Sequence, residues 1–170
     1  MAELHLDRVA DRREVNARII YWGVEGAGKQ TNLRAIHRKL RPDHRGRLEA
    51  VATQLDPSVC WYRLPIELGE IAGVKTRIQI IAVPGGSEQA PTRKQLLDRA
   101  DGVVFVADAR RDRIDENVAS REGLRAALPS NLELFQIGGF CGIEPADAAI
   151  WVDVASNAHR RGAVLSMDPN

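Results

Sequence analysis

The chain has 170 residues, and 44% of them are hydrophobic, which suits one domain with a single buried core. Its 24 Lys and Arg balance 23 Asp and Glu, which excludes a general attraction to nucleic acid or to an anionic membrane. The longest apolar runs, 80–83 and 103–107, are too short to span a bilayer. The two cysteines stand alone, as suits a reducing compartment. We therefore expect a cytoplasmic protein, and from its length a single domain over 1–170. Residues 1–14 would form an N-terminal extension, with no membrane span and no nucleic-acid partner.

The first half of the chain predicts a strand, a helix and then three strands. Residues 15–22 are β-branched and aromatic and run directly into glycines, as a strand before a turn does. In 29–41 the apolar residues recur at helical spacing, and Pro42 marks the end of the helix. Further strands are expected at 48–55, 61–67 and 75–83, the last two joined through a glycine-containing turn.

The second half alternates helices and strands. The segment GVVFVAD at 102–108 is nearly continuous in apolar residues, which is typical of a strand buried on both faces of a parallel sheet. The other elements are expected as helices at 92–100, 117–128 and 146–161 and as strands at 132–137 and 163–166. This alternation predicts an α/β fold with a mostly parallel, doubly wound sheet and one antiparallel edge pair within 61–83.

The segment from Gly23 to Lys29 matches the phosphate-loop pattern G-x-x-x-x-G-K between a predicted strand and a predicted helix. In such loops glycines allow consecutive backbone N–H groups to converge on phosphate oxygens at the positive end of the following helix. Lys29 would then reach the β- and γ-phosphates. The expected phosphate-binding residues are Gly23, Glu25, Gly26, Ala27, Gly28, Lys29, Gln30 and Thr31.

Two features of this loop depart from the usual pattern. A phosphate loop has Ser or Thr after the lysine, and its hydroxyl binds Mg²⁺; here Gln30 takes that place, with Thr31 one residue later. The longer glutamine side chain does not bring its oxygen to the position of the hydroxyl, and Thr31 lies ~100° further around the helix. Glu25 either repels the γ-phosphate or turns into solvent, and the sequence leaves both interpretations open.

Several further stretches extend the phosphate-loop pattern. These stretches are KQTNL at 29–33, LPIELGEI at 64–71, GVKTR at 73–77, VPG at 83–85, the pair Arg93-Lys94, and DGVVFVAD at 101–108. With these motifs, over roughly 15–128, the chain resembles the bacterial gliding and cell-polarity GTPases of the MglA type, within the Ras-like superfamily. The resemblance implies a Ras-like P-loop fold, a GTP/GDP switch, and a roadblock-type (MglB-like) homodimer as the partner that stimulates hydrolysis. The family's closing helix would be missing or displaced, because about four residues follow Ser166.

The resemblance also identifies positions at which the family's residues for hydrolysis are replaced. The first switch region would be Asp56-Pro57-Ser58, where the family carries an arginine at the position of Pro57 and a threonine at that of Ser58. The second would be Pro84-Gly85-Gly86, where the family has a glutamine in place of Gly86 to orient the attacking water. Magnesium would be left with Gln30 and Ser58 as ligands, and 137–142 contain no Asn-Lys-x-Asp motif for a guanine base.

Three functions remain open from the sequence. The first is a regulatory binding module, a pseudo-GTPase that contacts a roadblock-type or other protein partner through 48–70 and 84–100. The second is an active, partner-dependent GTPase in which Arg93, Lys94 or a partner's arginine replaces the missing one. The third is an ATP-using P-loop enzyme such as a small kinase. The one residue that supports this third function is Asp108, at the end of a predicted buried strand. Because four functional positions are replaced together, the sequence favours the first.

Two other groups of residues allow a structural and a functional interpretation. Around the first helix lie the basic residues Arg34, Arg38, Lys39, Arg41, Arg45 and Arg47. They either contact an acidic partner or form a solvated helix face, and the pattern favours the solvated face. Trp61 and Tyr62 are either anchors for a partner or half-buried strand residues.

Overall fold

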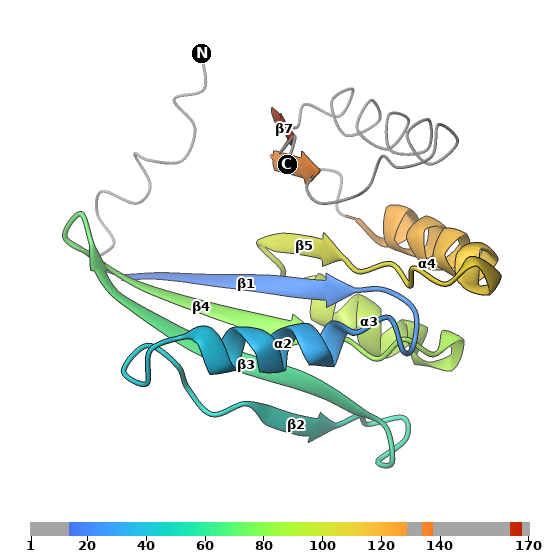
Figure 1. The fold of residues 1–170 in the computed structure, drawn as a ribbon, viewed down its shortest axis with the longest axis horizontal. Coiled ribbons are helices and arrows are strands. Elements are labelled where there is room, and N and C mark those ends of the chain that lie inside the picture. The colour runs from blue at the N-terminus through green and yellow to red at the C-terminus, as the bar shows by residue number, and fades with distance from the viewer. Residues whose placement is uncertain (1–13, 129–133, 138–163, 168–170) are drawn as a thin grey trace. The chain divides into compact units, whose positions relative to one another are not determined.

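A mixed five-stranded sheet forms the centre of the fold (Figure 1). The structure, a computed structural model, describes residues 14–128, 134–137 and 164–167. The strand order is β2-β3-β4-β1-β5, with β1 parallel to both of its neighbours. These strands are β1 (Glu14–Trp22), β2 (Glu49–Ala52), β3 (Cys60–Ile71), β4 (Val74–Ala82) and β5 (Gly102–Phe105).

The α/β class predicted from the sequence is confirmed, but the antiparallel part of the sheet is larger than one edge pair. β3 pairs antiparallel with β4, and β2 adds a second antiparallel pairing on the outside of β3. The β3–β4 turn consists of Ala72 and Gly73, with φ of 52° and 81°. Positive φ at both central residues is typical of a tight hairpin turn that matches the twist of its strands.

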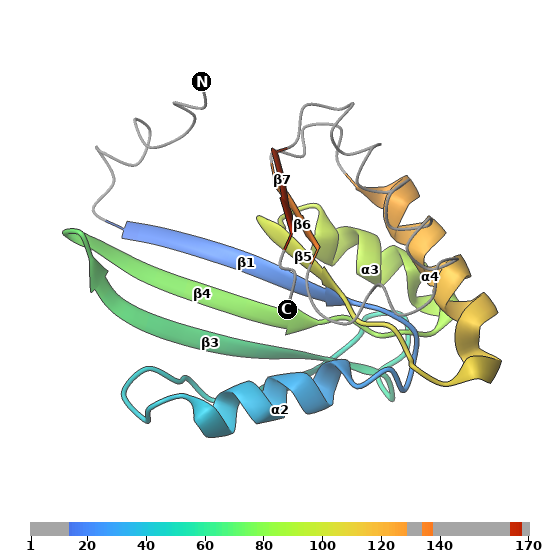
Figure 2. The same ribbon diagram turned by 45° about the horizontal axis from the view of Figure 1, so that its top comes forward.

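Within the described residues three α-helices accompany the sheet, and α2 lies on the face opposite to α3 (Figures 1 and 2). They are α2 (Lys29–Lys39), α3 (Ala90–Leu97) and α4 (Ile114–Ala127). Short 3₁₀ turns at Ser87–Gln89 and Arg111–Arg113 lead into α3 and α4. Both helices therefore begin a few residues before the predicted 92 and 117. Pro91 is compatible with this earlier start, because proline is tolerated in the first turn of a helix.

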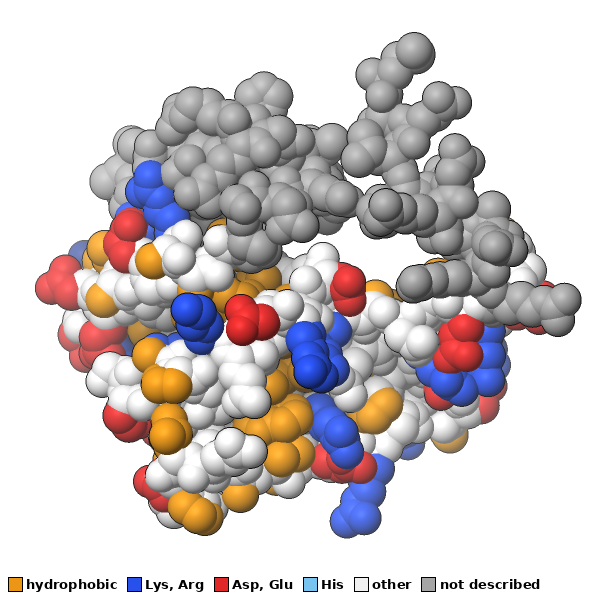
Figure 3. Space-filling view, turned by 180° about the vertical axis from the view of Figure 1, so that it is seen from behind, with side chains coloured by type: hydrophobic (Ala, Val, Ile, Leu, Met, Phe, Trp, Pro, Cys, Tyr) orange, Lys and Arg blue, Asp and Glu red, His pale blue; other side chains and the backbone are white. Residues whose placement is uncertain are grey.

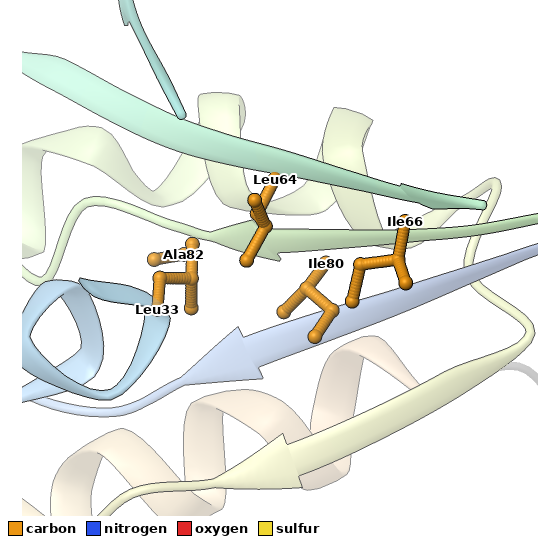
Figure 4. Packing of buried hydrophobic residues seen from close by; sticks show 5 residues of the cluster. All are labelled: Leu33, Leu64, Ile66, Ile80 and Ala82. Atoms are coloured by element: carbon orange, nitrogen blue, oxygen red, sulfur yellow. The ribbon is translucent and has the colours of Figure 1, made fainter. Parts of the chain in front are cut away.

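The core between α2 and the sheet follows from the alternation of side chains along the strands. Leu33 of α2 is fully buried and forms one cluster with four even-numbered residues of β3 and β4, which Figure 4 shows together with it: Leu64, Ile66, Ile80 and Ala82. On the other face, buried Trp22 of β1 donates from its indole Nε1 to the carbonyl of Ser120 in α4 at 3.0 Å. Both faces of the central strands are thus covered.

Residues 128–170 form a second compact unit, which contains two described strands. β6 (Leu134–Ile137) and β7 (Val164–Met167) pair in parallel as a separate two-stranded sheet. They correspond to the strands predicted at 132–137 and 163–166. The helix predicted at 146–161, residues 138–142 and the end of the chain at 168–170 lie outside the described residues.

The surface of the first unit is mixed in charge. On the side seen in Figure 3, opposite to the view of Figure 1, acidic and basic side chains are interspersed with apolar ones. This distribution fits the formal charge of +1. Within the described ranges, no helix combines the length and the apolar composition needed to cross a membrane.

Candidate functional site

Four loops leave the same edge of the sheet. Because β1, β4 and β5 are parallel, the segments that follow them, at 23–28, 83–89 and 106–113, begin at their common carboxyl edge. β3 runs the opposite way and pairs Tyr62 with Ala82, so the turn at 53–59 begins at that edge too. Open α/β sheets bind their ligands at this edge.

The predicted phosphate loop turns sharply and leads directly into α2. Gly26 and Gly28 have φ of 76° and 94°, values that side-chain-bearing residues rarely adopt. Gly23 is needed for a second reason, since a Cβ there would lie 2.0 Å from the carbonyl oxygen of Val106. The amide of Ala27 donates to the carbonyl of Val24 at 3.3 Å, which closes the turn before the helix.

Lys29 lies over this loop and is 7% exposed. Its ammonium donates to the carbonyls of Gly23 and Val24, each at 2.6 Å. Burial, and secondarily the positive charge of Arg93, lower the pKa of Lys29 to about 8, against an opposing effect of Glu25. The amine is therefore a buried cation whose partners are backbone carbonyls, an arrangement that an anionic ligand would stabilise.

The other residues of the loop differ in exposure. Glu25 and Thr31 are exposed, whereas Gln30 is half-buried. Glu25 is exposed to solvent, as one of the two interpretations from the sequence expected, and its negative charge raises the pKa of Lys29.

The segment Pro84-Gly85-Gly86 lies directly on the phosphate loop. A Cβ at Gly85 would be 2.2 Å from the backbone nitrogen of Glu25, so the two backbones are in close contact. Arg93 of α3 holds this segment from the other side by donating to the carbonyls of Pro84, at 3.3 Å, and of Gly86. The guanidinium also lies 5.2 Å from the ring centroid of Trp22, a cation–π arrangement. The second predicted switch region and the phosphate loop are therefore brought together.

Residues that follow β5 contact the phosphate loop and one another through hydrogen bonds. Arg113 donates from Nη2 to the carbonyl of Glu25 at 2.9 Å. Asp108 accepts from the Nη2 of Arg110 at 2.7 Å, and this hydrogen bonding lowers the pKa of its carboxyl to about 2. Asn117 bonds both to the amide of Asp108, at 2.9 Å, and to its carbonyl, at 2.8 Å.

Of these residues the sequence interpretation identified Asp108 but missed Arg110, Arg113 and Asn117. The signal that could have found them is topological. A strand that is parallel to β1 and next to it ends at the same edge of the sheet, so the residues that follow it lie near the phosphate loop.

The first predicted switch region forms a self-contained turn. The Thr53 hydroxyl donates to the carbonyl of Asp56 at 2.8 Å, and the amide of Val59 donates to the same carbonyl at 3.0 Å. The hydroxyl of Ser58 donates to Oδ1 of Asp56 at 2.7 Å, and Pro57 is exposed. The Ser58 oxygen predicted as a metal ligand is thus engaged within its own turn.

The residues near the loop do not fit a Mg²⁺ centre. Mg²⁺ in nucleotide sites is held by a hydroxyl and carboxylates together with the phosphates. Gln30 replaces the hydroxyl, and β4 ends in buried Ile81 and Ala82 rather than in an acid. The buried carboxylate nearby, Asp108, is already paired with Arg110. In the part of the chain that the structure describes, no cluster of three or more His, Cys, Asp or Glu could hold a metal.

The basic residues around α2 have structural partners or face solvent. Arg41 pairs with Asp43 at 2.5 Å, and Arg45 donates to the carbonyl of His37 at 2.6 Å, in the last turn of the helix. Arg34, Arg38, Lys39 and Arg47 are exposed, which agrees with the solvated helix face favoured from the sequence. Tyr62 packs against the core cluster of α2, whereas Trp61 is half-buried.

Comparison with known proteins gives one informative match. No protein-family model matches the chain. Over 116 residues, 68% of its length, the chain is 41% identical to the mutual gliding-motility protein MglA of Myxococcus xanthus (strain DK1622). The match spans 60% of the length of that relative.

Proposed function

Because the chain belongs to the MglA-type group of Ras-like P-loop proteins, we propose that it is a regulatory switch-fold module that binds nucleotide phosphates and hydrolyses GTP slowly or not at all. The binding part of this proposal is supported by Lys29, a buried cation over a glycine loop at the start of a helix. The regulatory part is supported by the close contact between Gly85 and Glu25. A phosphate entering the loop has to act on the 84–86 segment, and this segment can transmit ligand binding to a partner.

The weak hydrolysis that we propose rests on the identity of residue 86. The contact of the neighbouring Gly85 with the phosphate loop supports the interpretation of residue 86 as the position from which a side chain would orient an attacking water, and glycine has no side chain. Pro57 cannot supply an arginine's charge to the transition state, although such an arginine contributes ~10³–10⁵ in rate. Positioning and charge are nearly all that phosphoryl transfer requires of a protein.

Protein partners complete the proposal. We infer that the chain acts in the cytoplasm, in gliding motility as the name of its relative suggests, or in cell polarity. We also infer that a roadblock-type homodimer or another protein binds 48–70 and 84–100. Three exposed or half-exposed features lie in these segments: the edge strand β2, the Leu55 side chain, which is 58% exposed, and Trp61. GTP and GDP are the expected ligands.

One observation favours a second function, an active GTPase that depends on a partner. Arg93 already places a guanidinium beside the 84–86 segment, close enough to Lys29 for its charge to lower the lysine pKa. Rearrangement by a partner could direct this cation toward a γ-phosphate.

Single-turnover release of phosphate from GTP tests the proposal. Gly86→Gln is structurally acceptable, because φ at Gly86 is −61° and an added Cβ meets the end of the flexible Glu88 side chain. The wild-type chain should release phosphate slowly, whereas Gly86→Gln combined with Pro57→Arg should release it at least about tenfold faster. Fast release by the wild-type chain alone would contradict the pseudo-GTPase proposal.

A further inference from the structure

The site lacks the ligands of a metal but has two cations, Lys29 and Arg93, on which the nearby carboxylates Glu25 and Glu88 act without forming an ion pair within the described residues. The amine of Lys29 is almost completely buried and donates to backbone carbonyls. The guanidinium of Arg93 is half-buried and also donates to backbone carbonyls. Within the described residues neither cation has a carboxylate at ion-pair distance, whereas Arg110 and Arg113 pair with Asp108 and Glu116.

Both cations retain capacity for a further acceptor. An ammonium has three N–H donors, and two carbonyls account for two of those of Lys29. The Nε of Arg93 is buried and has no hydrogen-bond partner among the described residues. Buried donors are satisfied in stable proteins, and those that are left over at a binding loop point to a ligand. The ligand that satisfies two cations at a phosphate loop is an anion with several oxygens.

We propose that this site binds the phosphates of nucleotides as the metal-free anion, with Lys29 and Arg93 supplying the positive charge that Mg²⁺ supplies in other phosphate loops. This inference rests on the proposed function, because it specifies how the same site binds. If no Mg²⁺ is needed, phosphates can bind although residue 30 is a glutamine and β4 ends without an acidic residue. The lowered pKa of Lys29 agrees with the proposal, since burial, and after it the positive charge of Arg93, disfavour the charged amine until an anion binds.

The metal requirement is tested by calorimetric titration of the full chain, cleared of bound nucleotide, with GDP, GTP and pyrophosphate. Each titration is performed with millimolar Mg²⁺ and again with EDTA. The expected dissociation constants in the two media agree within about threefold. Weakening by more than about tenfold in EDTA would overturn the inference and leave the proposed function intact. Absence of binding in both media would overturn the proposed function and the inference with it.

The role of Arg93 is tested with three variants in EDTA. Arg93→Met should weaken binding of pyrophosphate by at least about tenfold, and Arg93→Lys, which keeps the charge, should recover most of the loss. Arg99→Met serves as the matched control, because Arg99 is exposed and lies just beyond α3, and it should bind like the wild type. Equal losses for Arg93→Met and Arg93→Lys, with unchanged unfolding midpoints, would show that the charge of Arg93 is not used and would overturn its assignment.

Discussion

At the scale of single residues, the two neighbouring glycines 85 and 86 have different environments. A Cβ at Gly85 would meet backbone atoms of Val24 and Glu25, at 2.5 and 2.2 Å, whereas a Cβ at Gly86 would meet the end of the Glu88 side chain. Gly85→Ala should therefore lower the free energy of unfolding by about 1–3 kcal/mol, as overpacking does, and Gly86→Ala should stay within about 0.5 kcal/mol of the wild type. Urea unfolding of both variants checks this pair, and equal stabilities would contradict the close contact of the two loops.

Lys29 determines the pH dependence of phosphate binding. Its pKa of about 8 lies below the usual 10.5, so the free protein loses this charge as the pH rises through 8. A bound anion favours the charged amine, and affinity should therefore be flat below pH 8 and fall by up to about tenfold per pH unit above it. Titration of the full chain with ADP between pH 7.5 and 9.5 measures the profile, because the phosphates of ADP keep their full charge over that range.

Two variants assign this pH profile to its residue. Lys39→Met, at an exposed position in the last turn of α2, should keep the profile of the wild type. Lys29→Met should bind weakly at every pH, with no break near 8. If the affinity of the wild type stays constant up to pH 9.5, the pKa of the free amine is not lowered and the buried environment assigned to Lys29 is wrong.

At the scale of elements, α2 positions the phosphate loop through one fully buried side chain. Leu33 packs against Leu64 and Ile80 on the sheet. Leu33→Ala should cost about 2–5 kcal/mol of unfolding free energy, the range for truncating a buried leucine. Leu55→Ala, at a side chain that is 58% exposed, is the control and should change stability by less than about 0.5 kcal/mol. A small effect at Leu33 would mean that α2 is not anchored through this cluster.

Local patterns predicted the elements better than the contacts between them. The strand at 14–22 and the helix from Lys29 were predicted almost to the residue, because apolar periodicity and the glycine loop both mark their junction. The start of α3 was predicted at 92, whereas the helix begins at Ala90 with Pro91 in its first turn, where proline is tolerated. The hydrogen bond from Arg113 to the carbonyl of Glu25 joins residues 88 positions apart, and no local pattern contains that information.

At the candidate site, too, the sequence predicted local features but not the contacts between elements. The motif identified Lys29 and the glycines, because phosphate binding requires those residue types at that spacing. It gave no indication that Gly85 contacts Glu25 or that Arg93 holds the 84–86 segment, since these depend on which strands are neighbours. The order β4-β1-β5 brings the three segments to one edge.

At the scale of the whole molecule, the described part of the chain offers groups suited to the phosphates of a nucleotide, but none that the sequence identifies for its base. In the proposed function the described site binds phosphates through glycine amides, Lys29 and Arg93, and groups of this kind make no distinction between bases. Residues 137–142, IGGFCG, lie outside the described residues apart from Ile137, and they supply no Asn, Lys or Asp for a guanine edge. A site without base-specific hydrogen bonds has no means of rejecting the wrong base.

We therefore expect the full chain to bind GDP and ADP with dissociation constants that agree within about threefold in competition titrations. GMP and AMP should bind at least about tenfold more weakly than the diphosphates, because Lys29 of a phosphate loop acts on the phosphates beyond the first. The monophosphates are the control that separates weak base recognition from weak binding in general. A preference for GDP over ADP of about a hundredfold would require guanine-binding groups elsewhere in the chain and would favour the active GTPase over the regulatory module.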